Sequence, residues 1–229
     1  MNDAPAAQSL IDGSTRLVAI IGDPIAQVKS PQVFNPRFKA KGLNMVLVPL
    51  HVRPDDFDMT VRGLKGLANL DGIIITVPYK ARAMGLVDRV ELVGTKTGAI
   101  NAMRREADGS WSGDMFDGTG LLRGLADLGL GVTGRSVVLI GAGGAGSAVA
   151  IAFAQAGATP IAIHDIDGEK ARALAARVAQ AYPPRSLASR CREPKASTSS
   201  SMRRRSAWRR RTGYPPRSAR SPHPSSSST

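Results

Sequence analysis

The 229-residue sequence contains very little cysteine and histidine. Cys191 is the one cysteine, and the three histidines, His51, His164 and His223, stand far apart along the chain. A disulfide framework and a cysteine-based metal site are therefore excluded, because each needs several cysteines close together. The scattered histidines offer no cluster for zinc, so we expect no metal site.

The N-terminal segment lacks the pattern of a signal peptide. Asp3 and Asp12 occur early, and no apolar core follows a basic start, so we expect a cytoplasmic protein. One uncharged run, residues 136–164, is long enough to span a bilayer. Its five glycines favour a strand, a turn and a helix instead, and we expect no association with a membrane.

Acidic residues are nearly absent from the C-terminal segment. The formal charge of the chain is +13, but residues 1–182 carry 19 basic and 17 acidic side chains, whereas residues 183–229 carry 12 basic and 1 acidic. This segment contains 13 Ser, 11 Arg and 7 Pro, and Leu187 is its only Leu, Ile, Val or Phe. It cannot bury enough apolar surface to offset the entropy of chain ordering, so we expect a disordered basic tail.

Before the tail, short apolar runs alternate with segments of helical spacing. Strands are predicted at residues 16–22, 43–50, 71–77, 98–104, 135–140 and 160–164, and helices at 31–41, 54–68, 118–128, 144–156 and 168–181. Asp108 and Gly109 predict a hairpin turn leading to Trp111. The alternation predicts an α/β fold with parallel sheets covered on both faces.

A glycine-rich turn matches the pattern G-x-G-x-x-G. It comprises Gly141, Ala142, Gly143, Gly144, Ala145 and Gly146, after a predicted strand and before an uncharged predicted helix. In this context the first glycine permits a tight turn, the second lets backbone amides approach a pyrophosphate, and the third allows close packing of helix on strand. We predict that these six residues bind a dinucleotide. The alternative is a packing turn without a ligand.

Asp165 follows the next predicted strand, 24 residues after Gly141. An acid at this position accepts hydrogen bonds from the adenosine ribose and repels a 2′-phosphate. We therefore predict that Asp165 contacts the cofactor and that NAD is favoured over NADP. The alternative is a surface aspartate with no role in binding.

Four further motifs precede the glycine-rich turn: GDPIAQVKSP at residues 22–31, TVPYK at 76–80, GAIN at 98–101 and DG at 117–118. In this order they resemble the shikimate/quinate dehydrogenase family over about residues 16–182. The resemblance implies an N-terminal α/β substrate domain over residues 1–115 and a partial Rossmann NAD(P)-binding domain over residues 116–182. It also implies an oxidoreductase that acts on a small hydroxy acid in a cleft between the two domains.

The resemblance further implies roles for individual residues. Lys80 matches the catalytic lysine of the family and Asp117 its paired aspartate, while Ser30, Thr76 and Asn101 match residues that bind the substrate. Hydride transfer needs a group that takes or gives the hydroxyl proton, and a partly buried lysine beside a carboxylate is suited to this task. The alternative is a surface lysine and an aspartate that caps the following helix.

At five positions an apolar residue replaces a polar residue of the family, and these positions are Val28, Ile74, Ala102, Met115 and Phe116. Phe34 likewise stands in place of a family histidine. We expect the reaction type to be kept and the substrate to be shikimate, quinate or a less polar hydroxy acid or cyclic alcohol. Family members that use NADP carry Asn-Arg-Thr where this chain has residues 165–167, which we interpret as a second sign of NAD.

The family pattern stops after Ala181. The composition beyond it is typical of GC-rich coding sequence read out of frame, and we hypothesise that a frameshift replaces the end of the enzyme. A nucleic-acid arm is the alternative, because arginine clusters flank Trp208, but we do not expect nucleic acid as a partner since the chain has no groove-reading helix or RNA-binding signature. A third reading is a catalytically impaired ligand-binding paralogue, against which the retention of Lys80 and Asp117 argues. The sequence does not determine the oligomeric state.

Overall fold

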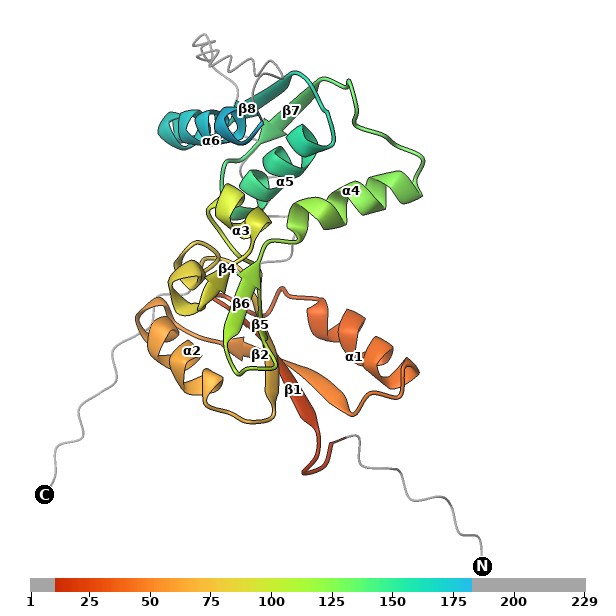
Figure 1. The fold of residues 1–229 in the computed structure, drawn as a ribbon, viewed down its shortest axis with the longest axis vertical. Helices are drawn as coiled ribbons and strands as arrows, with labels where there is room; N and C mark the ends of the chain where they lie inside the picture. The colour runs from red at the N-terminus through yellow and green to blue at the C-terminus, as the bar shows by residue number, and fades with distance from the viewer. Residues whose placement is uncertain (1–10, 183–229) are drawn as a thin grey trace, which may run out of the picture. The chain divides into compact units, whose positions relative to one another are not determined.

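The computed structural model describes residues 11–182 (Figure 1), which all fall within one compact unit. The predicted disordered tail, with the frameshift and nucleic-acid hypotheses attached to it, lies outside the described residues. The strands are β1 (Arg16–Gly22), β2 (Met45–His51), β3 (Leu70–Ile75), β4 (Arg89–Val90), β5 (Ala102–Arg105), β6 (Trp111–Asp114), β7 (Val137–Ile140) and β8 (Ile161–His164). The helices are α1 (Ser30–Ala40), α2 (Phe57–Lys65), α3 (Leu92–Thr97), α4 (Asp117–Asp127), α5 (Gly144–Gln155) and α6 (Gly168–Ala181), with 3₁₀ turns η1 (Pro54–Asp56) and η2 (Arg82–Leu86).

The strands form two sheets, and the α/β class is confirmed. The larger sheet has the order β2-β1-β3-β5-β6-β4, and the smaller one pairs β7 with β8 in parallel. Within the larger sheet β1, β2 and β3 are parallel, but β5 runs antiparallel to both β3 and β6. The predicted parallel pairing is found for these three strands and for β7 with β8, while the larger sheet as a whole is mixed. A short turn through Gly109 joins β5 to β6, as predicted, and so short a connection permits only antiparallel pairing.

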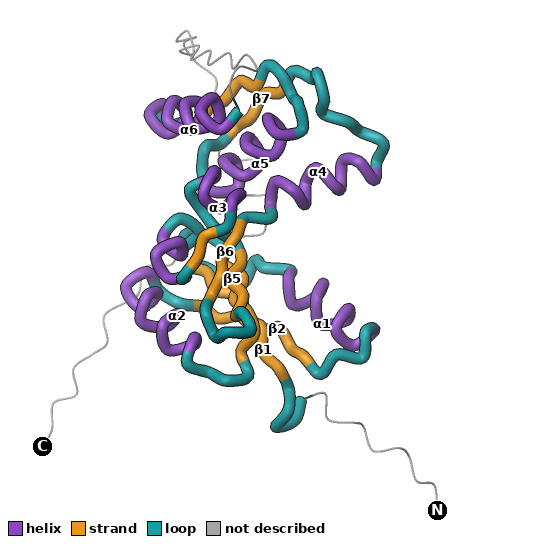
Figure 2. The backbone as a smooth tube through the Cα atoms, viewed as in Figure 1, coloured by secondary structure: helices purple, strands orange, loops and turns teal. Residues whose placement is uncertain are grey.

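The two faces of the larger sheet have different cover. Side chains alternate along each strand, so Ala19 and Ile73 point to one face and Ile20 and Ile74 to the other. On the first face Phe57 of α2 joins a buried core. On the second face α1 packs over β2, on the side of the sheet opposite α2 (Figures 1 and 2).

Helix α1 is fixed to β2 by a pair of hydrogen bonds. The Asn35 side chain accepts from the Leu47 amide at 2.7 Å and donates to the Leu47 carbonyl at 3.1 Å. Beside α1 the same face of the sheet is left open as a cavity. The prediction that helices cover both faces is therefore wrong here, and it also fails on β7, where Val138 and Ile140 are 74% and 81% exposed.

The second sheet has its own core. Helices α5 and α6 pack on β7 and β8, with Ile151, Ile161 and Val178 fully buried. The α6 face predicted from helical spacing is confirmed, because Leu174 and Ala175 are buried together with Ala171 and Val178. The two sheets lie on either side of the predicted domain boundary at residues 115 and 116, and the boundary itself stays a prediction.

Other element boundaries differ from the predictions. Helix α2 ends at Lys65, so Ala68 lies outside it and is exposed. The strand predicted at 98–104 begins only at Ala102, because Gly98 adopts a left-handed φ of +69° and ends α3 instead. The six-residue helix α3, together with β4 and η2, was not predicted. Within residues 11–182 no helix is both long and apolar enough to cross a membrane.

Candidate active site

Lys80 lies in the loop after β3 and is positioned by its neighbours. The preceding Tyr79 is 2% exposed, stacks on Phe57 with ring centroids 4.1 Å apart, and donates a hydrogen bond to the Val52 carbonyl. The Lys80 carbonyl accepts from the Ile100 amide at 2.9 Å. The backbone on both sides of the lysine is therefore fixed, and its side chain extends from a rigid base.

The Lys80 ammonium forms an ion pair with Asp117, the first residue of α4. The side chains are 15% and 29% exposed, so the pair is largely screened from solvent. Asn101 donates to the other carboxylate oxygen of Asp117 at 2.6 Å and accepts from the Phe116 amide at 3.0 Å. Asp117 is thus held between two donors, and Asn101 orients it.

The alternative reading of Asp117 as a helix cap is not what the structure shows. The N-cap position of α4 is Phe116, and this helix has no side-chain cap hydrogen bond. The carboxylate instead turns toward Lys80 and Asn101. Its position in the first turn still places a negative charge at the positive end of α4, which stabilises the helix.

A cavity of about 740 Å³ opens beside the ion pair. Its floor is the open face of the larger sheet, and α1 and the start of α4 form its sides. Lys80, Asp117, Asn101, Thr76 and Ser30 all line it, so the structure brings the predicted catalytic and substrate-binding residues to one place. A cavity of this size suits a small organic molecule.

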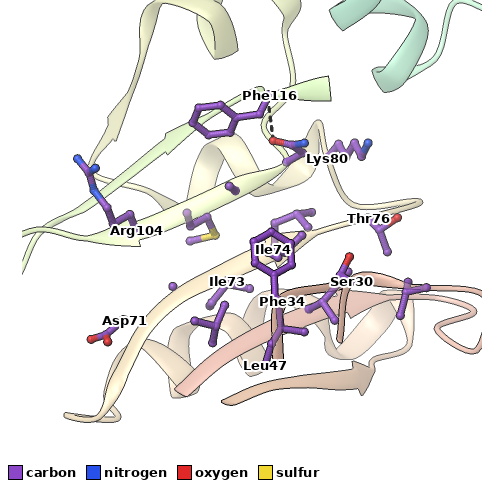
Figure 3. A pocket seen from close by; sticks show the side chains of 18 of the residues that line it. Ser30, Phe34, Leu47, Asp71, Ile73, Ile74, Thr76, Lys80, Arg104 and Phe116 are labelled. Atoms are coloured by element: carbon purple, nitrogen blue, oxygen red, sulfur yellow. Dashed lines mark hydrogen bonds between the residues drawn. The ribbon is translucent and has the colours of Figure 1, made fainter. Parts of the chain in front are cut away.

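Ser30 and Thr76 present hydroxyl groups to this cavity near Lys80 (Figure 3). Neither hydroxyl has a hydrogen-bond partner among residues 11–182, so both are available to a ligand. Thr76 follows β3, where its amide donates to the Ile21 carbonyl at 2.9 Å. Gly22 makes room for it, because a Cβ at position 22 would overlap the Thr76 methyl group.

Four of the five apolar departures line the cavity, and these are Val28, Ile74, Ala102 and Phe116. Met115 does not. It is 1% exposed and packs with Ala99 and Ala148 in a separate small cluster. Phe34, which was noted only as a departure, also lines the cavity. Its contribution was not predicted, although Phe34 and Phe38 stand four positions apart on the predicted helix and both line the cavity.

The glycine-rich turn has the geometry expected of a phosphate-binding loop. Gly141 adopts a φ of +107°, which favours glycine, and a Cβ on Gly146 would overlap the Gly141 carbonyl. Space around Gly143 is open, and α5 begins at the next residue. The amides at the start of this 12-residue helix can hold a pyrophosphate, so the residues present fit a dinucleotide.

Gly144 connects this turn with Lys80. A Cβ at Gly144 would lie 3.3 Å from Cδ and 3.4 Å from Cβ of Lys80. The fingerprint does not require glycine at this position, so no motif pointed to this contact. The structure thus brings the start of α5 against the lysine side chain.

Asp165 is engaged inside the loop. Its carboxylate accepts from the Ala142 amide at 2.7 Å and from the Asp167 amide at 2.9 Å. The amide donors of Ala142 and Asp167 hold the pKa of Asp165 below its ordinary value. Each oxygen therefore accepts one hydrogen bond within the loop, and contact of Asp165 with a cofactor stays a prediction.

Comparison with known proteins finds relatives that are shikimate dehydrogenases. Residues 20–103 match the family model described as the shikimate dehydrogenase substrate binding domain. A shikimate dehydrogenase (NADP(+)) of Rubrobacter xylanophilus is 42% identical over 67% of this chain and 54% of its own length. The chain thus spans about half the length of the curated relatives it matches.

Solved structures of shikimate and quinate dehydrogenases have a similar fold. A shikimate dehydrogenase in complex with NADP+ superposes with a TM-score of 0.69 at 34% identity, covering 74% of this chain and 58% of that one. Quinate dehydrogenase from Corynebacterium glutamicum, in complex with NAD, also gives 0.69, at 28% identity over 76% of this chain and 64% of that one.

The cofactor prediction is wrong. The curated relatives from Rubrobacter xylanophilus and Geobacter metallireducens are both named as NADP(+) enzymes, which contradicts a preference for NAD over NADP. The inference relied on Asp165 as an acid facing the ribose, whereas its carboxylate is bound by loop amides. The resemblance itself is confirmed: the chain is related to the shikimate dehydrogenases along most of the residues that the structure describes.

Proposed function

We propose that the protein is an NADP-linked oxidoreductase of the shikimate dehydrogenase type, which interconverts a ring hydroxyl and a ring ketone of a small hydroxy acid. The observation that carries this proposal is the Lys80–Asp117 ion pair at the cavity beside the glycine-rich turn. The relatives, which are shikimate and quinate dehydrogenases, support the same reaction.

Lys80 supplies the proton chemistry. A nicotinamide cofactor held by the glycine-rich turn would supply the hydride for reduction of the ketone, or accept it on oxidation of the alcohol. In the direction of reduction, the Lys80 ammonium donates its proton to the oxygen that becomes the alcohol. In the direction of oxidation, the neutral Lys80 amine accepts the hydroxyl proton as the carbonyl forms.

Asp117 and Asn101 position the lysine. The carboxylate holds the ammonium by charge, and Asn101 prevents the carboxylate from rotating, because it bonds the second oxygen. The Ser30 and Thr76 hydroxyls, which have no partner within residues 11–182, bind the polar substituents of the substrate. Residues 141–146 form the loop that would hold the cofactor pyrophosphate, through the backbone amides at the start of α5. We further propose the division into a substrate domain over 1–115 and a nucleotide domain over 116–182, and we retain the cytoplasmic location as a prediction.

A paired substitution tests the proposal. The full-length chain is incubated with NADP and shikimate, quinate or 3-hydroxycyclohex-1-ene-1-carboxylate, and NADPH formation is followed by absorbance. Lys80→Met should reduce kcat by about 10²–10⁴-fold, the usual contribution of a general acid or base. Lys39→Met removes an exposed lysine of α1 and serves as the control. The proposal fails if Lys80→Met is as active as the control, or if no acid yields NADPH.

A further inference from the structure

The floor of the cavity is apolar across three adjacent strands. Ile74 of β3 is in register with Ile20 of β1 on one side and with Ala102 of β5 on the other. All three side chains line the cavity. Because β3 is hydrogen-bonded to β1 and β5, its backbone polar groups are already paired. The floor therefore offers a ligand neither side-chain nor backbone hydrogen bonds.

Phenylalanines of two other elements also line the cavity, namely Phe34 and Phe38 of α1 and Phe116 before α4, and Figure 3 labels Phe34 and Phe116. Phe34 comes from α1, which Asn35 fixes to β2. Phe116 precedes α4, and its amide is bound by the Asn101 side chain. Phe116 is 53% exposed and Phe34 38%, so apolar surface at the cavity is left for a ligand to cover.

The polar groups available to a ligand gather at one end. In Figure 3 Lys80, Thr76 and Ser30 lie toward one side of the cavity, and Arg104 and Asp71 toward the other. The far pair is already engaged, because Arg104 binds Glu106 at 2.9 Å and Asp71 binds Arg16. Gln27, a further polar residue of the lining, donates to the Pro24 carbonyl at 2.6 Å. A ligand with polar groups all around its ring would leave some of them unpaired.

On the basis of the proposed function, we propose that the cavity selects a ring substrate with one polar side. The substrate is a cyclic secondary alcohol, or its ketone, whose carboxylate and reacting oxygen lie near Lys80, Ser30 and Thr76. The remainder of its ring is hydrocarbon and packs on Ile74 between Phe34 and Phe116. A polyhydroxylated ring such as that of shikimate binds more weakly, because a hydroxyl placed on the floor loses its water without gaining a partner.

Direct binding of two probes tests this inference. Shikimate has three ring hydroxyls, and 3-hydroxycyclohex-1-ene-1-carboxylate is the same acid with only one. Isothermal titration calorimetry of each probe with the full-length chain should give a Kd at least roughly tenfold lower for the mono-hydroxy acid, as expected when buried hydroxyls lack partners. Equal or tighter binding of shikimate overturns the inference, and so does failure of both acids to bind.

A substitution in the floor should shift the preference. Ile74→Asn places an amide between Ile20 and Ala102. It should lower the ratio of the shikimate Kd to the Kd of the mono-hydroxy acid by roughly tenfold, mainly because shikimate binds more tightly. Val138→Asn makes a comparable change on an exposed strand outside the cavity, and it should leave the ratio unchanged. An unchanged ratio in a folded Ile74→Asn variant contradicts the assignment of the floor.

The binding test is independent of the test for turnover. If the mono-hydroxy acid binds more tightly but no NADPH forms, the inference about the cavity stands and the proposed function fails. If NADPH forms more efficiently with shikimate and shikimate binds more tightly, the proposed function stands and the inference fails.

Discussion

Gly144 provides a sharp test of how the glycine-rich turn and the lysine are joined. An alanine there would place its Cβ 3.3 Å from Lys80 Cδ, closer than most side chains tolerate, so Lys80 must move by a few tenths of an ångström. A valine adds a methyl group about 1.5 Å farther out, and the lysine must then move substantially. Because a displacement of about 1 Å at a reacting group costs about 100-fold in rate, Gly144→Val should reduce kcat by about that factor and Gly144→Ala only several-fold.

The Gly144→Ala variant should lose activity but not stability against unfolding. Replacing glycine by alanine in a helix stabilises it by up to about 1 kcal/mol, so Gly144→Ala should unfold at an equal or higher urea concentration while losing activity. Gly124→Ala in α4 is the matched control, because no atom outside its own helix lies within 4 Å of the added Cβ. It should gain stability without loss of kcat.

The assay measures kcat with NADP and the acid that is turned over best, together with the Kd of NADP. The separate Kd distinguishes displacement of Lys80 from disturbance of the phosphate-binding loop. Wild-type kcat in a folded Gly144→Val variant would refute the reasoning. It would show that the catalytic position of Lys80 does not depend on the absence of a side chain at position 144.

Three further predictions concern aspartates outside the ion pair. Asp165→Ala removes the acceptor of the Ala142 and Asp167 amides and should weaken NADP binding roughly tenfold, measured by calorimetry. Asp167 caps α6 by accepting from the Glu169 amide, so Asp167→Ala should lower the free energy of unfolding by about 1 kcal/mol in urea titrations, with little change in kcat. Hydrogen bonds from Ser14, and then Asn44, lower the pKa of Asp12 from 3.8 to about 2. Because its folded pKa is lowered, Asp12 stabilises the fold above pH 3.8 and this contribution is lost as the pH falls through about 2. The stability difference between wild type and Asp12→Asn, followed by urea unfolding across this range, should therefore close toward pH 2.

The sequence predicts best where one segment determines its own structure. Helix α6 has the predicted bounds, because Asp167 caps its start and apolar residues recur at helical spacing along its buried face. The short helix α3 carries no such pattern, and its end depends on the left-handed conformation of Gly98. The strand after it was accordingly placed too early, and the open face beside α1 depends on packing between distant segments.

In the site, too, local motifs were predictable and contacts between distant segments were not. Motifs drew attention to Lys80 and Asp117, which the fold joins across 37 positions of sequence. No local pattern could show that Asn101 binds the Asp117 carboxylate or that Gly144 lies against Lys80. The error in the cofactor preference has the same origin, because the position of an acid after a strand does not tell which donors its carboxylate meets.

The position of β3 in the centre of the larger sheet has a consequence for how such a protein changes during evolution. The backbone of β3 is held from both sides, whereas Lys80 and Asp117 come from the segments that follow β3 and β6. Residues on the face of β3 can therefore be exchanged without displacing the ion pair. In the proposed enzyme, substrate preference and proton transfer would thus depend on separate parts of one cavity, and each could vary while the other is kept.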